Sequence, residues 1–294
     1  SQTLQFSKTP SFIALYDYQA NLSFEGAIEL RSGYLLAEIK AIYEKNGEAN
    51  LFYDSNLFQD VFSLKADLKD VSLRDMTPLY TFFSKNTSEL HAYQGSFNGT
   101  LKLESSNQEE SLELSSFHVT APKLHFPETH ITLSADEVKG HLSGLKNESL
   151  EELESLHLNL KNGCIRDPKG IEINNCYGSL TYKDKVLNDL EFTFEPACFF
   201  ASLKKEPGFT EKLTFNLSGK LEHFAKSFLE EDIHKLFDFK EEEPFLFSGD
   251  LIFKMPNGRL MPHLKGQFFF SEKNKDLFVD IAFISKINYL AYLY

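Results

Sequence analysis

The side chains best suited to chemistry in this chain are nine histidines and several runs of carboxylates. His118, His125 and His130 are the closest set, and three imidazoles can bind zinc when a fold brings them into one tetrahedral site. Each of the three occupies a polar position of an alternating, proline-containing segment, where a solvated histidine is typical. We therefore expect no metal centre and no cofactor.

Paired carboxylates are the second chemical signal, because two acids facing each other across a cleft can cleave a glycosidic bond. The pairs here, such as Glu109–Glu110 and the run 241–243, lie in polar turn-like stretches. The sequence contains no nucleophile elbow, phosphate-binding loop, dinucleotide fingerprint, zinc-protease helix or C-x-x-C. We expect a protein that is not an enzyme, and a carbohydrate-active enzyme on a β scaffold is the weakest alternative.

Composition narrows the class of partner. The 294 residues are 42% hydrophobic and carry a formal net charge of −13, with 29 phenylalanines and no tryptophan. A negative surface repels a phosphate backbone, so no nucleic acid is expected as a partner. No segment approaches the roughly 20 apolar residues of a membrane-spanning helix. The start at Ser1 and the apolar end at 287–294 are typical of a portion of a longer protein.

Apolar and polar residues alternate along most of the chain. The segments 156–161, 190–195 and 213–218 are examples, reading LHLNLK, LEFTFE and LTFNLS. A period of two predicts half-buried antiparallel strands, and the Gly, Pro, Asn and Asp punctuation separates about 15 to 18 of them. The sequence therefore predicts a mainly β protein.

Two segments depart from this alternation and predict short inserted helices. Near 222–239, apolar residues such as Phe224, Phe228 and Leu236 return at helical spacing between acidic residues. Near 75–85, Asp75 or Thr77 can cap a helix that tolerates a proline in its first turn. In a sheet protein we expect such helices to cover apolar surface.

Glycine recurs inside the alternating segments, at Gly95 and Gly99, then at Gly144, Gly219 and Gly249. Glycine within a strand indicates a bulge, a bend or a close backbone approach. We expect a long curved antiparallel sheet whose apolar side forms a groove, built as one elongated portion over residues 1–294. A β-sandwich, in which two apolar faces pack together, is the alternative that the sequence leaves open.

One succession of residues resembles a known family. The strand-like segment 64–68 leads into Asp70-Val71-Ser72-Leu73, a short helix-like stretch, a polar loop, and a segment with Gly95, Phe97, Gly99, Leu101 and Leu103. A similar order recurs over 217–251. This order resembles the AsmA-like proteins, the group that includes TamB, of diderm bacterial envelopes.

The resemblance implies a non-enzymatic lipid-transfer module, with a β-groove that carries phospholipid acyl chains between envelope membranes. It implies a periplasmic location, an anchor in a segment outside this chain, and inner- and outer-membrane proteins at the ends of the groove. We expect the groove to be lined by apolar residues of the alternating strands, namely Phe97, Leu101, Leu103, Leu158, Leu160, Phe192, Phe194, Phe215, Leu217, Phe253, Phe268 and Phe270. The alternative is a structural, adhesive or outer-membrane-assembly scaffold whose apolar faces pack on each other and hold no lipid.

Overall fold

The computed structural model describes residues 2–15, 18–44, 47–76, 91–106, 109–126, 130–146, 153–168, 172–184, 186–196, 199–205, 212–220, 244–254, 261–270 and 277–282. The chain divides into two compact units, each described by itself. Unit 1 contains Ser1–Gly170 and Leu180–Val186, and unit 2 contains Ile171–Ser179 and Leu187–Tyr294. The described residues form 17 strands, which confirms the prediction of a mainly β protein.

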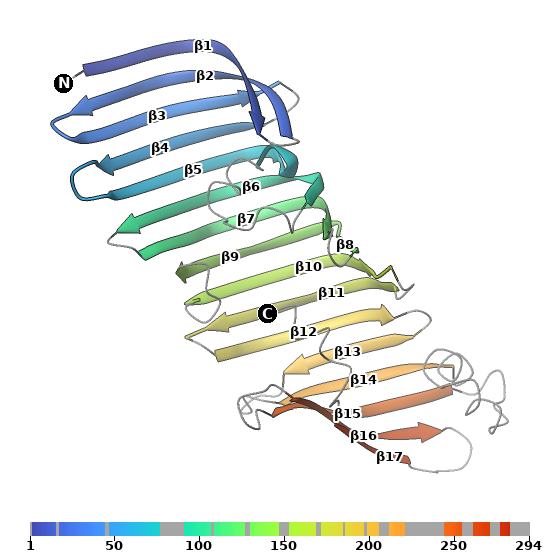
Figure 1. Ribbon diagram of the computed structural model, residues 1–294. Helices are drawn as coiled ribbons and strands as arrows, with labels where there is room; N and C mark the ends of the chain where they lie inside the picture. The colour runs from blue at the N-terminus through green and yellow to red at the C-terminus, as the bar shows by residue number, and fades with distance from the viewer. Residues whose placement is uncertain are drawn as a thin grey trace. The chain divides into compact units, whose positions relative to one another are not determined.

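Unit 1 contains ten strands and one turn of 3-10 helix (Figure 1). They are β1 (Gln2–Leu15), β2 (Tyr18–Arg31), β3 (Tyr34–Tyr43), β4 (Glu48–Asn56), β5 (Val61–Ser72), η1 (Leu73–Met76), β6 (His91–Ser106), β7 (Glu109–Phe126), β8 (Ile131–Ser134), β9 (Glu137–Lys146) and β10 (Ser155–Arg166).

Each strand of unit 1 pairs antiparallel with the next one along the chain, from β1 to β7. β8 and β9 then share one position between β7 and β10, since both pair with both of these strands. The described strands of unit 1 are thus one continuous sheet. This confirms the predicted long antiparallel sheet for unit 1, in place of two stacked sheets.

Register shifts bend this sheet. The pairing of β1 with β2 shifts between Phe6 and Thr9, where Figure 1 shows both strands bending. The pairing of β5 with β6 shifts between Leu68 and Val71, and Asp70 there has a φ of 51°. The Asp70 backbone N–H donates to Asn98 Oδ1 at 2.9 Å, and Asn98 Nδ2 donates to Asp70 Oδ1 at 3.0 Å. These two hydrogen bonds between Asp70 and Asn98 therefore hold the bulge in place.

Glycines occur where strands approach most closely. A Cβ on Gly26 would lie 2.0 Å from the Glu38 carbonyl oxygen, and one on Gly99 would lie 2.4 Å from that of Ser116. Both residues also have φ values, 149° and 158°, that L side chains rarely adopt. The close approach predicted at Gly99 is confirmed, and Gly26 is a second case that the sequence analysis did not single out.

The core of unit 1 lies on one face of the sheet. The buried residues of its main cluster are Leu22, Ala41, Ala49, Ala66, Leu68, Val71, Phe97 and Leu101. Leu73 and Met76 of η1 pack against this cluster. Small side chains alternate with large ones, which lets the paired strands and η1 pack closely.

Unit 2 contains the remaining strands, with β11 belonging to it as far as Ser179. They are β11 (Glu172–Lys183), β12 (Val186–Pro196), β13 (Phe200–Lys205), β14 (Lys212–Lys220), β15 (Pro244–Lys254), β16 (Met261–Phe270) and β17 (Leu277–Ala282). From β12 to β17 each strand pairs antiparallel with the next. Phe199 is buried, and a Cβ on Gly219 would lie 2.5 Å from its Cδ1, so this predicted glycine position is also a close approach.

Two helices were predicted from the sequence, one near 222–239 and one near 75–85. The helix near 222–239 lies outside the described residues. Of the helix near 75–85, the described part is Asp75 and Met76, which belong to the 3-10 turn η1 and not to an α-helix.

Candidate functional site

The apolar side chains of unit 1 form rows that cross the strands, because directly paired residues of antiparallel strands share one face. Row 1 contains Leu4, Ile28, Ala37, Tyr53, Leu64, Leu103, Leu112 and Leu145. Row 2 contains Phe6, Gly26, Ile39, Leu51, Ala66, Leu101, Leu114, Leu142 and Leu156.

Two further rows lie beside these on the same face. Row 3 contains Phe24, Ala41, Ala49, Leu68, Gly99, Phe117, Gly140 and Leu158. Row 4 contains Val71, Phe97, Val119, Val138 and Leu160. The phenol of Tyr53 is the single polar side-chain group in the four rows, so together they make an uninterrupted apolar surface across the described strands of unit 1.

Burial increases from row 1 to row 4. Val71 and Phe97 in row 4 are 0% and 5% exposed, whereas Leu4 in row 1 is 64% exposed. Most other residues of rows 1 and 2 are half-buried, with Leu103 and Ala66 among the buried exceptions. The face is thus covered by its own chain at Val71 and Phe97 of row 4, whereas Val119, Val138 and Leu160 of that row and most of row 1 are half-buried.

Aromatic rings contribute to both sides of this surface. Phe97 and Phe117 stack with ring centroids 6.4 Å apart, and Tyr53 stacks on Phe62 at 6.0 Å. Tyr43 packs against the core cluster, and its burial, together with the carboxylate of Asp75, raises its pKa to about 12. The covered side is therefore dry enough to disfavour a phenolate.

The opposite face of unit 1 is polar and carries pairs of opposite charge. Lys40 lies 3.0 Å from Glu48, and Lys102 lies 2.8 Å from Glu104. The pKa of Asp67 is lowered by the hydrogen bond that it accepts from the Thr100 hydroxyl, and further by Lys65. These contacts are typical of a solvated outer surface.

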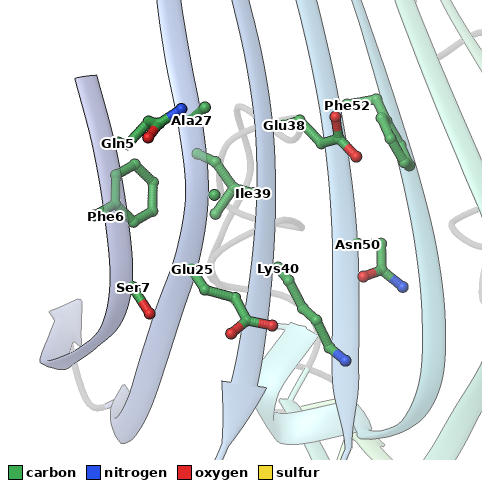
Figure 2. A pocket seen from close by; sticks show the side chains of 11 residues that line it. Gln5, Phe6, Ser7, Glu25, Ala27, Glu38, Ile39, Lys40, Asn50 and Phe52 are labelled. Atoms are coloured by element: carbon green, nitrogen blue, oxygen red, sulfur yellow. The ribbon is translucent and has the colours of Figure 1, made fainter. Parts of the chain in front are cut away.

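Two hollows lie on this polar face. The first has a volume of about 610 Å³, and residues of β1 to β4, including Gly26, line it. Figure 2 shows Glu25 and Lys40 side by side in it, with Glu38 near Phe52. Five of its eleven lining residues are charged or carry an amide, and Phe6 and Ile39 of row 2 also line it. The charged groups make this hollow a less favourable place for an acyl chain than rows 1 and 2.

The second hollow, of about 470 Å³, contains His118, His141 and His157. The rings of His141 and His157 stack at 5.7 Å, and Asn159 Nδ2 lies 2.8 Å from His157 Nε2. His118 instead contacts Glu137 at 3.1 Å. Among the described residues, no group of three or more His, Cys, Asp or Glu residues could hold a metal ion.

The structure places the predicted lining residues of unit 1 on the apolar face. Leu103 is in row 1, Leu101 in row 2, Leu158 in row 3, and Phe97 and Leu160 in row 4. That these residues line a lipid groove stays a prediction, because it depends on what the face binds. Phe97 lies on the covered side, away from the accessible row.

In unit 2 the predicted residues also share rows. Phe192 pairs with Leu203, which pairs with Phe215. A neighbouring row contains Phe194, Ala201, Leu217 and Phe247, and the rings of Phe215 and Phe247 lie 6.1 Å apart. The positions Phe253, Phe268 and Phe270 belong to β15 and β16, but their side chains lie outside the described part of the chain.

No lining residue was predicted in β1 to β5, although all four rows begin in these strands. In β2 the alternation of Leu22, Phe24 and Ile28 was a usable signal. In β3 it was obscured, because Leu36 and Ile42 lie on the polar face and the apolar face carries small residues such as Ala41.

The chain was compared with known proteins in three ways. No family model matches it, and neither the curated proteins nor the solved structures contain a match. No helix among the described residues has the length and hydropathy to cross a membrane.

Proposed function

We propose that this chain is a non-enzymatic lipid-binding and lipid-transfer module, as its resemblance to the AsmA-like proteins implies. The acyl chains would lie on rows 1 and 2 of unit 1, with the polar face turned to water. The single observation that carries the proposal is the uninterrupted set of apolar residues in rows 1 and 2, most of them half-buried, across the paired strands from β1 to β10.

Physical chemistry supports an acyl ligand on this surface. Soluble proteins rarely leave large contiguous apolar patches uncovered, and such patches commonly mark a binding surface. Each buried CH₂ group contributes about 0.8 kcal/mol, so an acyl chain of ordinary length can be held without any polar contact. A row of similar aliphatic side chains has no deep specific pocket, which would let a chain slide along it.

The proposal places the protein in the periplasm of a diderm envelope, anchored by a segment outside this chain. Phospholipid would be its ligand, and inner- and outer-membrane proteins would meet the ends of the groove. These statements follow from the resemblance and not from the rows themselves.

The test is lipid bound to the purified chain, measured by native mass spectrometry and by extraction. We expect phospholipid to copurify, and Leu51→Glu in row 2 to reduce the bound amount at least fivefold, because a carboxylate beside an acyl chain is unfavourable. The control is Asn50→Glu, which lies on the polar face of the same strand between Lys40 and Asp67.

The proposal is contradicted if the purified chain contains no lipid and also takes up none from vesicles. That result would favour the scaffold alternative, for which Val71 and Phe97 of row 4 are the supporting observation, since both are buried in the core cluster of unit 1.

A further inference from the structure

Five exposed apolar side chains belong to one edge of unit 1, which contains the β2–β3 turn, the β4–β5 turn and the start of β1. Figure 1 shows the two turns and the N-terminal end of β1 on the same side of unit 1. We name this set the rim patch, and it consists of Leu4, Leu30, Tyr34, Leu57 and Phe58. Gln2 pairs with Leu30 and Tyr34 pairs with Asn56, so all three segments are neighbours in the sheet. Leu57 and Phe58 at the tip of the β4–β5 turn are 55% and 81% exposed.

The tip is held firmly despite its exposure. The Leu57 backbone N–H donates to the Gly33 carbonyl at 2.8 Å, and the Phe58 N–H donates to Asn56 Oδ1 at 3.1 Å. The Phe58 ring occupies the space where a Cβ on Gly33 would lie. Contacts between the two turns therefore preset the direction of Phe58, which lowers the entropy cost of binding.

We propose that the rim patch docks the protein on a lipid bilayer surface. The patch includes both faces of the sheet, with Leu30 on the apolar face and Tyr34 on the polar one, and Phe58 at the tip of a turn is its most exposed residue. A bilayer interface can surround such a projection, whereas a groove-shaped partner fits one face. Tyrosine and phenylalanine are also side chains that suit the interfacial region of a membrane.

Charge favours a bilayer of zwitterionic lipid. The whole chain has a net charge of −13, which an anionic surface would repel. At the rim patch, Arg31 is paired with Glu29 at 2.6 Å, and Asp60 is the remaining charged residue of the two turns. The docking surface is thus nearly neutral, and apolar contact is the main attraction.

The rim patch is continuous with the proposed lipid surface, since Leu4 is the first residue of row 1 and Leu30 lies on the same face. A lipid that leaves the bilayer at this point would reach row 1 without crossing a polar surface. This route rests on the proposed function, but docking itself does not.

Vesicle binding tests the proposal directly. The 294-residue chain is sedimented with phosphatidylcholine–phosphatidylethanolamine vesicles, and Leu57→Ser with Phe58→Ser is expected to weaken binding at least tenfold. The matched control is Phe200→Ser with Leu246→Ser, which removes side chains that are 51% and 42% exposed and share one face of unit 2. We expect this control to change binding less than twofold.

A fluorescence experiment gives a second, independent readout, because the natural chain contains no tryptophan. With Phe58→Trp, vesicles should shift the emission to the blue, and brominated acyl chains should quench it. Phe200→Trp should show neither effect. Absence of both effects at position 58 would contradict the proposal even if the double serine variant misfolds.

The outcomes separate docking from lipid transfer. If the chain binds vesicles but retains no lipid, docking is supported and the proposed function is contradicted. If it retains lipid but does not bind vesicles, the proposed function is supported and docking is contradicted. If the chain dimerises through Leu57 and Phe58 and does not bind vesicles, the docking proposal is wrong, and the rim patch is a contact between two copies of this chain.

Discussion

Rows 1 and 4 of unit 1 have nearly the same side-chain chemistry but different surroundings. Both consist of aliphatic and aromatic residues on one face of the sheet, yet Val71 in row 4 is buried and Leu4 in row 1 is exposed. The difference arises beyond the strands, because η1 packs on the covered side and a bulge at Asp70 bends β5 there. Apolar composition alone thus does not tell a core row from a binding row.

The largest effect is expected in row 4. Phe97→Ala removes a ring that is buried and stacked on Phe117. It should lower the free energy of unfolding by about 3–5 kcal/mol, as truncation of a packed phenylalanine does. Denaturant unfolding followed by circular dichroism measures this loss. A loss below 1 kcal/mol would mean that row 4 is not a packed core, and the comparison with row 1 would fail.

A smaller loss is expected where the strands approach most closely. Gly99→Ala places a methyl group 2.4 Å from the Ser116 carbonyl oxygen and needs a φ that alanine disfavours. Relief of this contact requires the strands to separate, so we expect destabilisation of about 1–3 kcal/mol. The control is Gly33→Ala, which also needs a disfavoured φ, of 88°, but meets the side chain of Phe58 instead of backbone atoms. Equal losses at both positions would contradict a backbone origin.

The free energy of unfolding should fall at alkaline pH because of Tyr43, which packs against the core cluster. Burial and the carboxylate of Asp75 raise its pKa to about 12. Because the folded-state pKa lies above the unfolded value of about 10, the contribution of neutral Tyr43 is complete below pH 10. It is then lost as pH rises towards 12. Unfolding measured at pH 9 and 11.5 should show a smaller decline for Tyr43→Phe than for the natural chain, and equal declines would contradict the assignment.

The smallest effect is expected in row 1. Leu4→Asn replaces a side chain that is 64% exposed, so stability should change by no more than about 0.5 kcal/mol. The same denaturant experiment measures it. A loss comparable to that of Phe97→Ala would mean that another part of the chain covers Leu4. The claim that row 1 is accessible at this residue would then be wrong.

Much of the fold could be predicted from the alternation of apolar and polar residues. The number of strands and the antiparallel class were predicted, and five lining residues of unit 1, Phe97, Leu101, Leu103, Leu158 and Leu160, lie on one face as expected. Strand length was harder, because β7 continues for 18 residues through Pro122 and its register shifts against β9. Bulges absorb such residues without ending a strand, and local sequence does not reveal them.

The candidate site was only partly predictable for a related reason. The histidines considered together in the sequence, His118, His125 and His130, do not share one hollow. His118 instead lies in a hollow with His141 and His157 from β9 and β10. Strand pairing brings these residues together, and pairing depends on register between segments that are distant in sequence.

The sequence by itself determined which side of most strands is apolar and that the outer surface is acidic and solvated, because a period of two is a local property of the chain. Tertiary structure decided which apolar residues line up into rows, where η1 packs on them, and that Leu57 and Phe58 lie against Gly33 of the neighbouring turn. The physical reason is that burial depends on contacts between segments far apart in the sequence. Alternation specifies a face, and only packing decides whether that face meets its own chain or remains accessible.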